Sequence, residues 1–284
     1  MGDQGDPEHI DKELKLKAHL LELRKRIVRI AIAVGLILGI TLTFGIKEFD
    51  INGQNILMLY PDPFHNIAIQ ITFAMKEALI PEEVALIQIA PGQAFFAQIY
   101  IAVLIGIIFG MPIIARELSA FIAPALYPNE RKSVANITLP IIGLFATGCL
   151  FAYIVVVPYV LDFLYVYGES IGVQTFLNIT EFISFTMQFL VAFGVSFQLP
   201  VIMWAVSKAE LVTPKFWRRN LRYAVLILII FGALITPDGS GVTMWFISIP
   251  MLILYVAGML IVESKLKKSP PVGPSQSPPV GPPK

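Results

Sequence analysis

The sequence predicts an all-α integral membrane protein with six transmembrane helices. Three observations lead to this prediction: the composition, the length of the apolar runs and the placement of Lys and Arg. Of the 284 residues, 56% are hydrophobic and only 14% are charged, and the mean hydropathy is +0.74. Because a soluble domain carries about 25% charged residues, we expect most of this chain to lie in lipid.

The apolar runs have the length that a membrane span needs, about 20 residues for roughly 30 Å of hydrocarbon. Six runs are predicted to cross: 27–46, 94–115, 134–161, 182–207, 223–235 and 242–262. The run 223–235 is short, near 20 Å if it is helical. Four spans with a re-entrant 223–262 hairpin are an alternative, but basic flanks on both sides of this hairpin disfavour it.

The basic residues predict the orientation of the spans. Nineteen of the 21 Lys and Arg lie in the N-terminal segment up to Arg29, the 116–133 loop, the 208–222 loop and the C-terminal tail. The other connections contain only Lys47 and Lys76. The positive-inside rule therefore places both termini and these two loops in the cytoplasm.

The segments outside the spans are less uniform. Residues 1–17 are polar and are expected to be flexible, 18–263 form the membrane domain, and the Pro/Gly/Ser-rich 264–284 is predicted to be a disordered cytoplasmic tail. Residues 19–26 are predicted to form an interfacial helix in which Glu22 pairs with Arg26. Between 67 and 74 the pattern fits a strand or an amphipathic helix, and we favour a short helix on the membrane surface.

Several functions are made improbable by what the sequence contains. One cysteine, Cys149, excludes an intrachain disulfide framework and a multi-cysteine metal cluster. The three histidines are scattered outside the spans and no glycine-rich phosphate loop is present, so we expect no catalytic residues, metal or cofactor. A net charge of +1 does not suggest nucleic acid. Apart from Arg29 at the start of the first, the predicted spans contain no Asp, Glu, Lys, Arg or His, which argues against an ion-coupled carrier.

Polar residues with a candidate binding role remain. Gln188 and Gln198 of the fourth predicted span either hydrogen-bond to a neighbouring helix or, for Gln198, face a hollow or a partner helix. Asp238 can cap the last helix. Glu22 and Glu130 are carboxylates among basic residues. They either form local ion pairs or jointly bind a cationic ligand such as a guanidinium group.

Four sequence segments together resemble the TatC family of twin-arginine translocase subunits. They are His19-Leu-Leu-Glu-Leu-Arg-Lys-Arg26, Phe121-Ile-Ala-Pro-Ala-Leu-Tyr127 with Glu130-Arg131, Val191-Ala-Phe-Gly-Val-Ser-Phe197 before Pro200, and Leu234-Ile-Thr-Pro-Asp238. The resemblance implies a cupped six-helix receptor in the cytoplasmic membrane, with short fifth and sixth spans and no enzymatic activity. Its implied partners are twin-arginine signal peptides of folded proteins, single-span TatA/TatB-type proteins, membrane lipids and further copies of itself.

Roles are carried over by the same resemblance. Glu22 and Glu130 would hold the two arginines of the signal peptide, and Arg24, Phe121 and Arg131 would shape that surface. Asp238 would belong to the short periplasmic turn. At position 198 the family often has a glutamate, so Gln198 is expected to offer hydrogen bonds to a partner helix or signal peptide but no proton switch. A small-solute carrier or channel is the alternative function, and a membrane-embedded hydrolase would need a Ser/His or metal site inside the spans.

Overall fold

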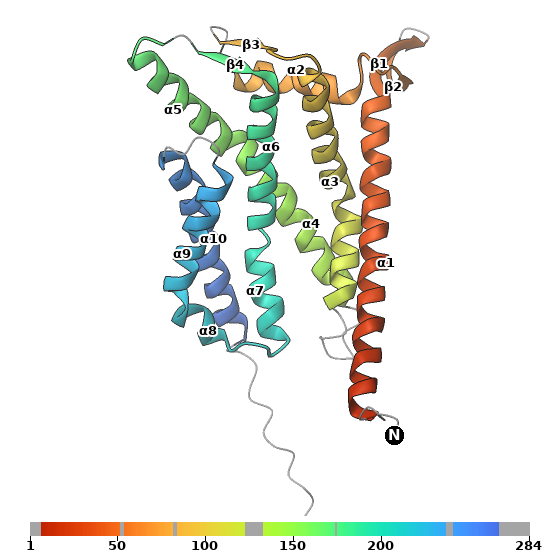
Figure 1. Cartoon of the computed structure of the whole chain (residues 1–284), viewed down its shortest axis with the longest axis vertical. Coiled ribbons are helices and arrows are strands. Elements are labelled where there is room, and N and C mark those ends of the chain that lie inside the picture. Colours follow the sequence, from red (N-terminus) through yellow and green to blue (C-terminus); the bar gives the residue numbers. More distant parts are fainter. Residues whose placement is uncertain are drawn as a thin grey trace, which may run out of the picture.

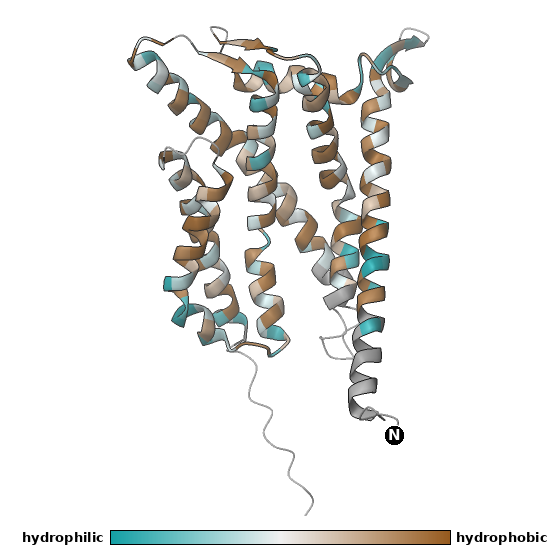
Figure 2. Cartoon of the chain, in the orientation of Figure 1, coloured by the Kyte–Doolittle hydropathy of each residue, from teal (hydrophilic) through white to brown (hydrophobic). Residues whose placement is uncertain are grey.

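A computed structural model describes residues 7–51, 54–81, 84–122, 133–173, 175–236 and 241–266. Long helices stand side by side and are covered at one end by a β-hairpin, a short helix and a small parallel sheet (Figure 1). We call this the hairpin end, and the opposite end, which includes the short helix α8 (Pro214–Arg219), the α8 end. The long helices are mostly hydrophobic along their length, and hydrophilic residues gather toward their ends (Figure 2).

Five helical segments are long and apolar enough to cross a membrane: Leu20–Thr43, Gln93–Ala120, Thr138–Ser170, Ile179–Lys208 and Val242–Lys265. They belong to α1 (Pro7–Thr43), α3 (Gln93–Ile122), α4 (Ser133–Phe151) with the π-helix η3 (Ala152–Val156) and α5 (Val157–Ser170), α6 (Ile179–Ser196) with α7 (Leu199–Lys208), and α10 (Val242–Leu266). A sixth apolar helix, α9 (Leu221–Ile235), has 15 residues. The chain is therefore a multi-pass membrane protein.

The helix boundaries correct several sequence-based expectations. The predicted interfacial helix 19–26 is not separate, because it continues without a break into the first span as part of α1. The third span extends beyond 161 to Ser170 through a π-helical turn. The sixth span is not short: α10 has 25 residues, about 37 Å. Its C-terminal half packs on α7 at Gly258, which lies against Pro200 and Met203, and pairs with α8 through Glu263 and Arg218.

The fourth predicted span is two helices. Pro200 has no backbone N–H to donate to the carbonyl of Ser196, and its ring clashes with that carbonyl. The chain responds with a turn at Phe197 and Gln198, where the Gln198 N–H bonds to Val195 O at 3.0 Å. This places Gln198 at the junction of α6 and α7.

The hairpin end contains structure that hydropathy left open. Strands β1 (Phe44–Ile51) and β2 (Gln54–Pro61) pair antiparallel, and α2 (Ile67–Leu79) follows, which confirms the short helix and excludes a strand there. Asn66 caps α2 by accepting a hydrogen bond from Ile69 N at 2.9 Å. Strands β3 (Ala85–Ile87) and β4 (Phe176–Asn178) pair in parallel, which the sequence did not predict.

Helix α6 forms the centre of the core. Phe182, Ile183, Phe189 and Phe193 are fully buried on it. Helices α4 and α6 cross closely: a Cβ at Gly148 would lie 2.6 Å from the backbone oxygen of Phe193, and a Cβ at Gly194 would lie 2.7 Å from the ring of Phe145. Such a crossing needs glycine, and it holds α4 against α6 beside the junction at Gln198.

Candidate functional site

The structure describes only some of the predicted signal-peptide residues. Glu22 and Arg24 lie on α1, whereas Glu130, Arg131 and Asp238 fall outside the described residues. Phe121 is in the last turn of α3, and its side chain is also outside the described part. The structure therefore describes the α1 half of the predicted site and leaves the pairing of Glu22 with Glu130 a prediction.

An ion cluster joins α1 to α3 at the same level. Arg26 Nη2 lies 2.6 Å from Glu22 Oε1, which confirms the predicted pair four residues apart. The other Arg26 nitrogen, Nη1, lies 3.0 Å from Glu117 Oε2. Arg29 Nη1 reaches Glu117 Oε1 at 3.3 Å. One arginine thus bridges an exposed carboxylate on α1 and a buried carboxylate on α3.

Helix geometry explains why these residues meet. Positions 22, 26 and 29 lie on one face of α1, since residues three and four apart are neighbours on a helix. This face packs along α3. Arg26 Nη2 also donates to the carbonyl of Ala120 at 3.4 Å, so the guanidinium lies against the last turns of α3. Glu22 therefore lies close to the last turns of α3, since both contact Arg26 Nη2.

Glu117 is the residue that the sequence reasoning missed. It was placed outside the second span, which was expected to end at 115, but α3 continues to Ile122 and buries Glu117 to 8% exposure. A buried carboxylate is costly unless it is paired, and Arg26 and Arg29 both pair with it. The available signal was a carboxylate directly after an apolar run, opposite a basic run at the start of the preceding span.

The two carboxylates of the cluster differ in what they can still bind. The Glu117 side chain is 10% exposed and has both oxygens in ion pairs, whereas the Glu22 side chain is 47% exposed. Glu22 is therefore the carboxylate that a cation from the surrounding water can reach, and Glu117 holds Arg26 in place.

A second feature is an apolar groove of about 380 Å³ along the α6–α7 junction, between α3 and α4. Gln198 lines it and donates from Nε2 to Ile141 O of α4 at 3.2 Å and to Gly194 O at 3.3 Å. Its Oε1 atom is buried without a hydrogen-bond partner among the described residues. The expected hydrogen bond of Gln198 to a neighbouring helix is confirmed.

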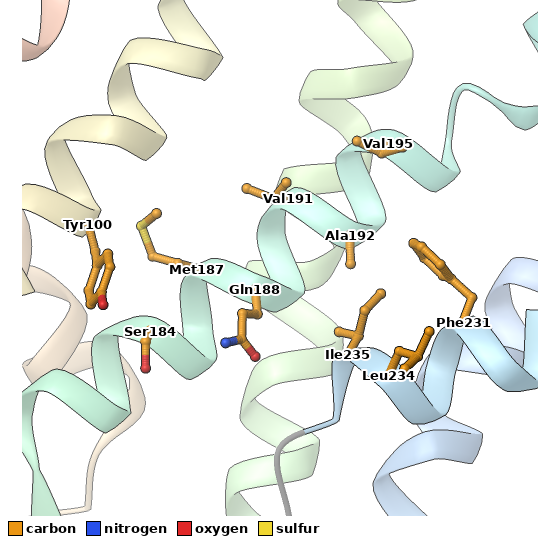
Figure 3. Close-up of a pocket in the computed structure, with 10 residues that line it drawn as sticks. All are labelled: Tyr100, Ser184, Met187, Gln188, Val191, Ala192, Val195, Phe231, Leu234 and Ile235. Atoms are coloured by element: carbon orange, nitrogen blue, oxygen red, sulfur yellow. The ribbon is translucent and has the colours of Figure 1, made fainter.

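A hollow of about 520 Å³ continues along α6 toward the hairpin end, and Val195 lines both spaces. Ser184 and Gln188 lie along one side of α6, with Tyr100 of α3 on one flank and three residues of α9 on the other: Phe231, Leu234 and Ile235 (Figure 3). Gln188 and Gln198 are about 15 Å apart along the helix. Both spaces are lined mostly by apolar side chains, with Gln188 in the wall of the hollow and Gln198 in the wall of the groove.

These features define a multi-span helical membrane protein whose described sites are suited to binding. Among the described residues, no group of three or more His, Cys, Asp or Glu side chains could hold a metal ion. The profile of the family described as "Sec-independent protein translocase protein (TatC)" matches residues 18–250. The chain belongs to the TatC family.

Relatives and solved structures agree with this assignment. A Sec-independent protein translocase protein TatC from Cenarchaeum symbiosum is 51% identical over 261 residues, which are 92% of this chain and 99% of the relative. The TatC protein of Aquifex aeolicus is 32% identical over 90% of this chain and 97% of its own length. A crystal structure described as the twin arginine translocase receptor TatC superposes with a TM-score of 0.72 at 29% identity, covering 87% of this chain and 98% of that one.

Proposed function

We propose that this chain is the membrane receptor of twin-arginine protein export. It binds twin-arginine signal peptides of folded proteins at the cytoplasmic face and uses no cofactor. The observation that carries the proposal is the ion cluster at the α8 end, where the exposed Glu22 carboxylate shares Arg26 with the buried Glu117. The family assignment gives the alternative of a small-solute carrier or channel no support.

Binding of a guanidinium group at Glu22 follows from the way Arg26 is held. An incoming arginine competes with Arg26 for the Glu22 oxygens, and Arg26 can yield because Glu117 still neutralises it. Arg24 and Lys25 are nearby in the chain and would repel a second cation unless another carboxylate neutralises its charge. Glu130 supplies that carboxylate in the proposed site, and Phe121 and Arg131 form its surroundings.

Site-specific crosslinking tests the proposal. A photoreactive twin-arginine signal peptide is added to membranes that contain the chain, its Glu22→Ala variant or its Glu130→Ala variant. We expect both variants to lose the crosslink, and a Lys-Lys peptide to crosslink poorly to the unaltered chain because an ammonium group cannot bind a carboxylate bidentately. Full crosslinking by both variants would refute the assignment of this site.

The groove along α6 and α7 is proposed to receive the helix of a single-span TatA/TatB-type partner. Its apolar lining suits a transmembrane helix. Gln198 lines it, its buried Oε1 has no partner among the described residues, and its amide can turn toward a polar residue of that helix. Gln198→Leu should weaken copurification of the partner. Val225→Leu on α9, outside both hollows, serves as the control.

The proposed orientation follows from charge. The α8 end carries the basic segments around Arg24–Arg29 and Lys215–Arg222, so it faces the cytoplasm together with both termini. Asp238 then lies in a short periplasmic turn, in a protein of the cytoplasmic membrane that also associates with other copies of itself. Labelling single cysteines at positions 215 and 76 from one side of sealed cells tests this: only position 76 should react from outside.

A further inference from the structure

A third groove lies at the α8 end; none of the ion-cluster residues lines it, and it shares Val201 with the groove at Gln198. It has a volume of about 280 Å³ and lies between α4, α7 and α10. One wall residue is charged, Lys265 near the end of α10. The others are Pro140, Leu144, Pro200, Val201, Trp204 and Ile261. A space of this kind suits an apolar chain with a negatively charged end.

Two lysine side chains lie close to Trp204. Lys265 lines the groove together with Trp204, and the ammonium group of Lys208 lies 5.0 Å from the centre of the Trp204 ring. The half-buried indole of Trp204 lies in the second half of α7, near the end of the helix. Tryptophan side chains are enriched at this level, where lipid meets water. Two lysines thus approach the groove from α7 and α10.

In the part of the chain that the structure describes, Lys265 has no carboxylate partner. The nearest acidic residue in its own helix, Glu263, makes a two-bond pair with Arg218, at 2.9 Å from Nε and 2.7 Å from Nη2. Within the described part of the chain, Lys265 itself forms no ion pair or hydrogen bond, and its side chain is exposed. Its ammonium group is therefore available to an external anion, while the four-carbon stem lies along the groove.

We propose that this groove binds an anionic phospholipid. One acyl chain lies along Leu144, Val201 and Ile261, and the phosphate rests near Lys265 and Lys208 at the rim beside Trp204. Basic pockets between transmembrane helices are the sites at which acidic headgroups bind. The occupant is a lipid and not a free phosphate, because one exposed ammonium group binds an anion weakly unless buried apolar area adds to it. The site is independent of signal-peptide binding.

Native mass spectrometry of the full chain tests the proposal. Phosphatidylglycerol and phosphatidylcholine with identical acyl chains are titrated onto delipidated protein, and the apparent dissociation constants are compared. Lys265→Gln should weaken phosphatidylglycerol binding about fivefold, the effect of one charge near an anionic membrane surface, and should leave phosphatidylcholine binding unchanged. Lys215→Gln, which removes an equal charge from an exposed position at the same end, is the control and should have no effect. Leu144→Trp fills the groove and should weaken both lipids.

The identity of the occupant is tested in membranes with a photoreactive amino acid in place of Leu144. We expect an adduct with lipid. An adduct with a second copy or another protein would overturn the proposal, as would equal binding of the two lipids. An effect of Lys265→Gln no larger than that of Lys215→Gln would overturn it as well.

Discussion

Replacing Glu117 by Gln tests the role of the buried carboxylate in the ion cluster. The substitution keeps the shape of the side chain and removes its charge, so Arg26 and Arg29 lose their shared partner. Arg29 is 63% exposed and can turn to water, but the Arg26 side chain is only 16% exposed and must rely on Glu22. We therefore expect Arg26 to hold Glu22 more tightly and to hinder an incoming guanidinium group.

The magnitude follows from burial. Exposed ion pairs contribute about 0–1 kcal/mol, and breaking a fully buried pair costs about 3–5 kcal/mol. The Arg26–Glu117 pair lies between these limits, so Glu117→Gln should lower the free energy of unfolding by about 1–3 kcal/mol. If Arg26 binds Glu22 more tightly by about 1.4 kcal/mol as a result, the affinity for a twin-arginine peptide falls about tenfold.

A double variant separates competition from general damage. In Glu117→Gln with Arg26→Gln, no arginine competes for Glu22, and peptide affinity should recover relative to Glu117→Gln alone. Affinity is measured by fluorescence anisotropy of a labelled peptide in detergent, and folding is monitored by thermal unfolding. Unchanged affinity in a folded Glu117→Gln protein, or a further loss in the double variant, would refute the idea that Glu117 holds Arg26 away from Glu22.

Two further predictions concern stability and ionisation. The hydrogen bond from Lys47 at 2.7 Å lowers the pKa of Asp62 to about 2. The resulting stabilisation of the hairpin end should persist from neutral pH to about pH 4 and be lost as the pH falls through 2. In a carbon-13 NMR titration, Lys47→Gln should raise the Asp62 pKa toward 3.8. An unchanged pKa would contradict the assignment. Gly194→Ala places a Cβ 2.7 Å from the Phe145 ring and should cost about 1–3 kcal/mol by thermal unfolding. Gly143→Ala, which meets nothing within 4 Å, should cost nothing, and equal effects of the two would count against the close crossing of α4 and α6.

Hydropathy predicted the membrane spans well because burial in lipid depends on composition averaged over a turn or more. It predicted the ends of helices less well. Glu117 lies beyond the apolar run, yet α3 continues through it because Arg26 and Arg29 of α1 pair with its carboxylate. An interaction over 91 residues of sequence leaves no local pattern.

Contacts that depend on local spacing were predictable from the sequence, and contacts between distant segments were not. The Glu22–Arg26 pair was predictable because it depends on helical spacing alone. The parallel pairing of β3 with β4 was not, since strands of three residues joined by about 88 residues of chain have no signature of their own. The break at Gln198 had a local signal in Pro200, but a proline inside an apolar run is compatible with either a kink or a division into two helices.

The affinity of twin-arginine peptides for the purified chain tests the central claim most directly. The comparison uses Glu22→Gln, which leaves Arg26 paired with Glu117, and a Lys-Lys peptide as the ligand control. We predict that Glu22→Gln lowers affinity for the twin-arginine peptide at least tenfold, to the level of the Lys-Lys peptide, while thermal unfolding shifts little. Undiminished and still arginine-selective binding by Glu22→Gln would contradict the claim that this carboxylate receives the signal peptide.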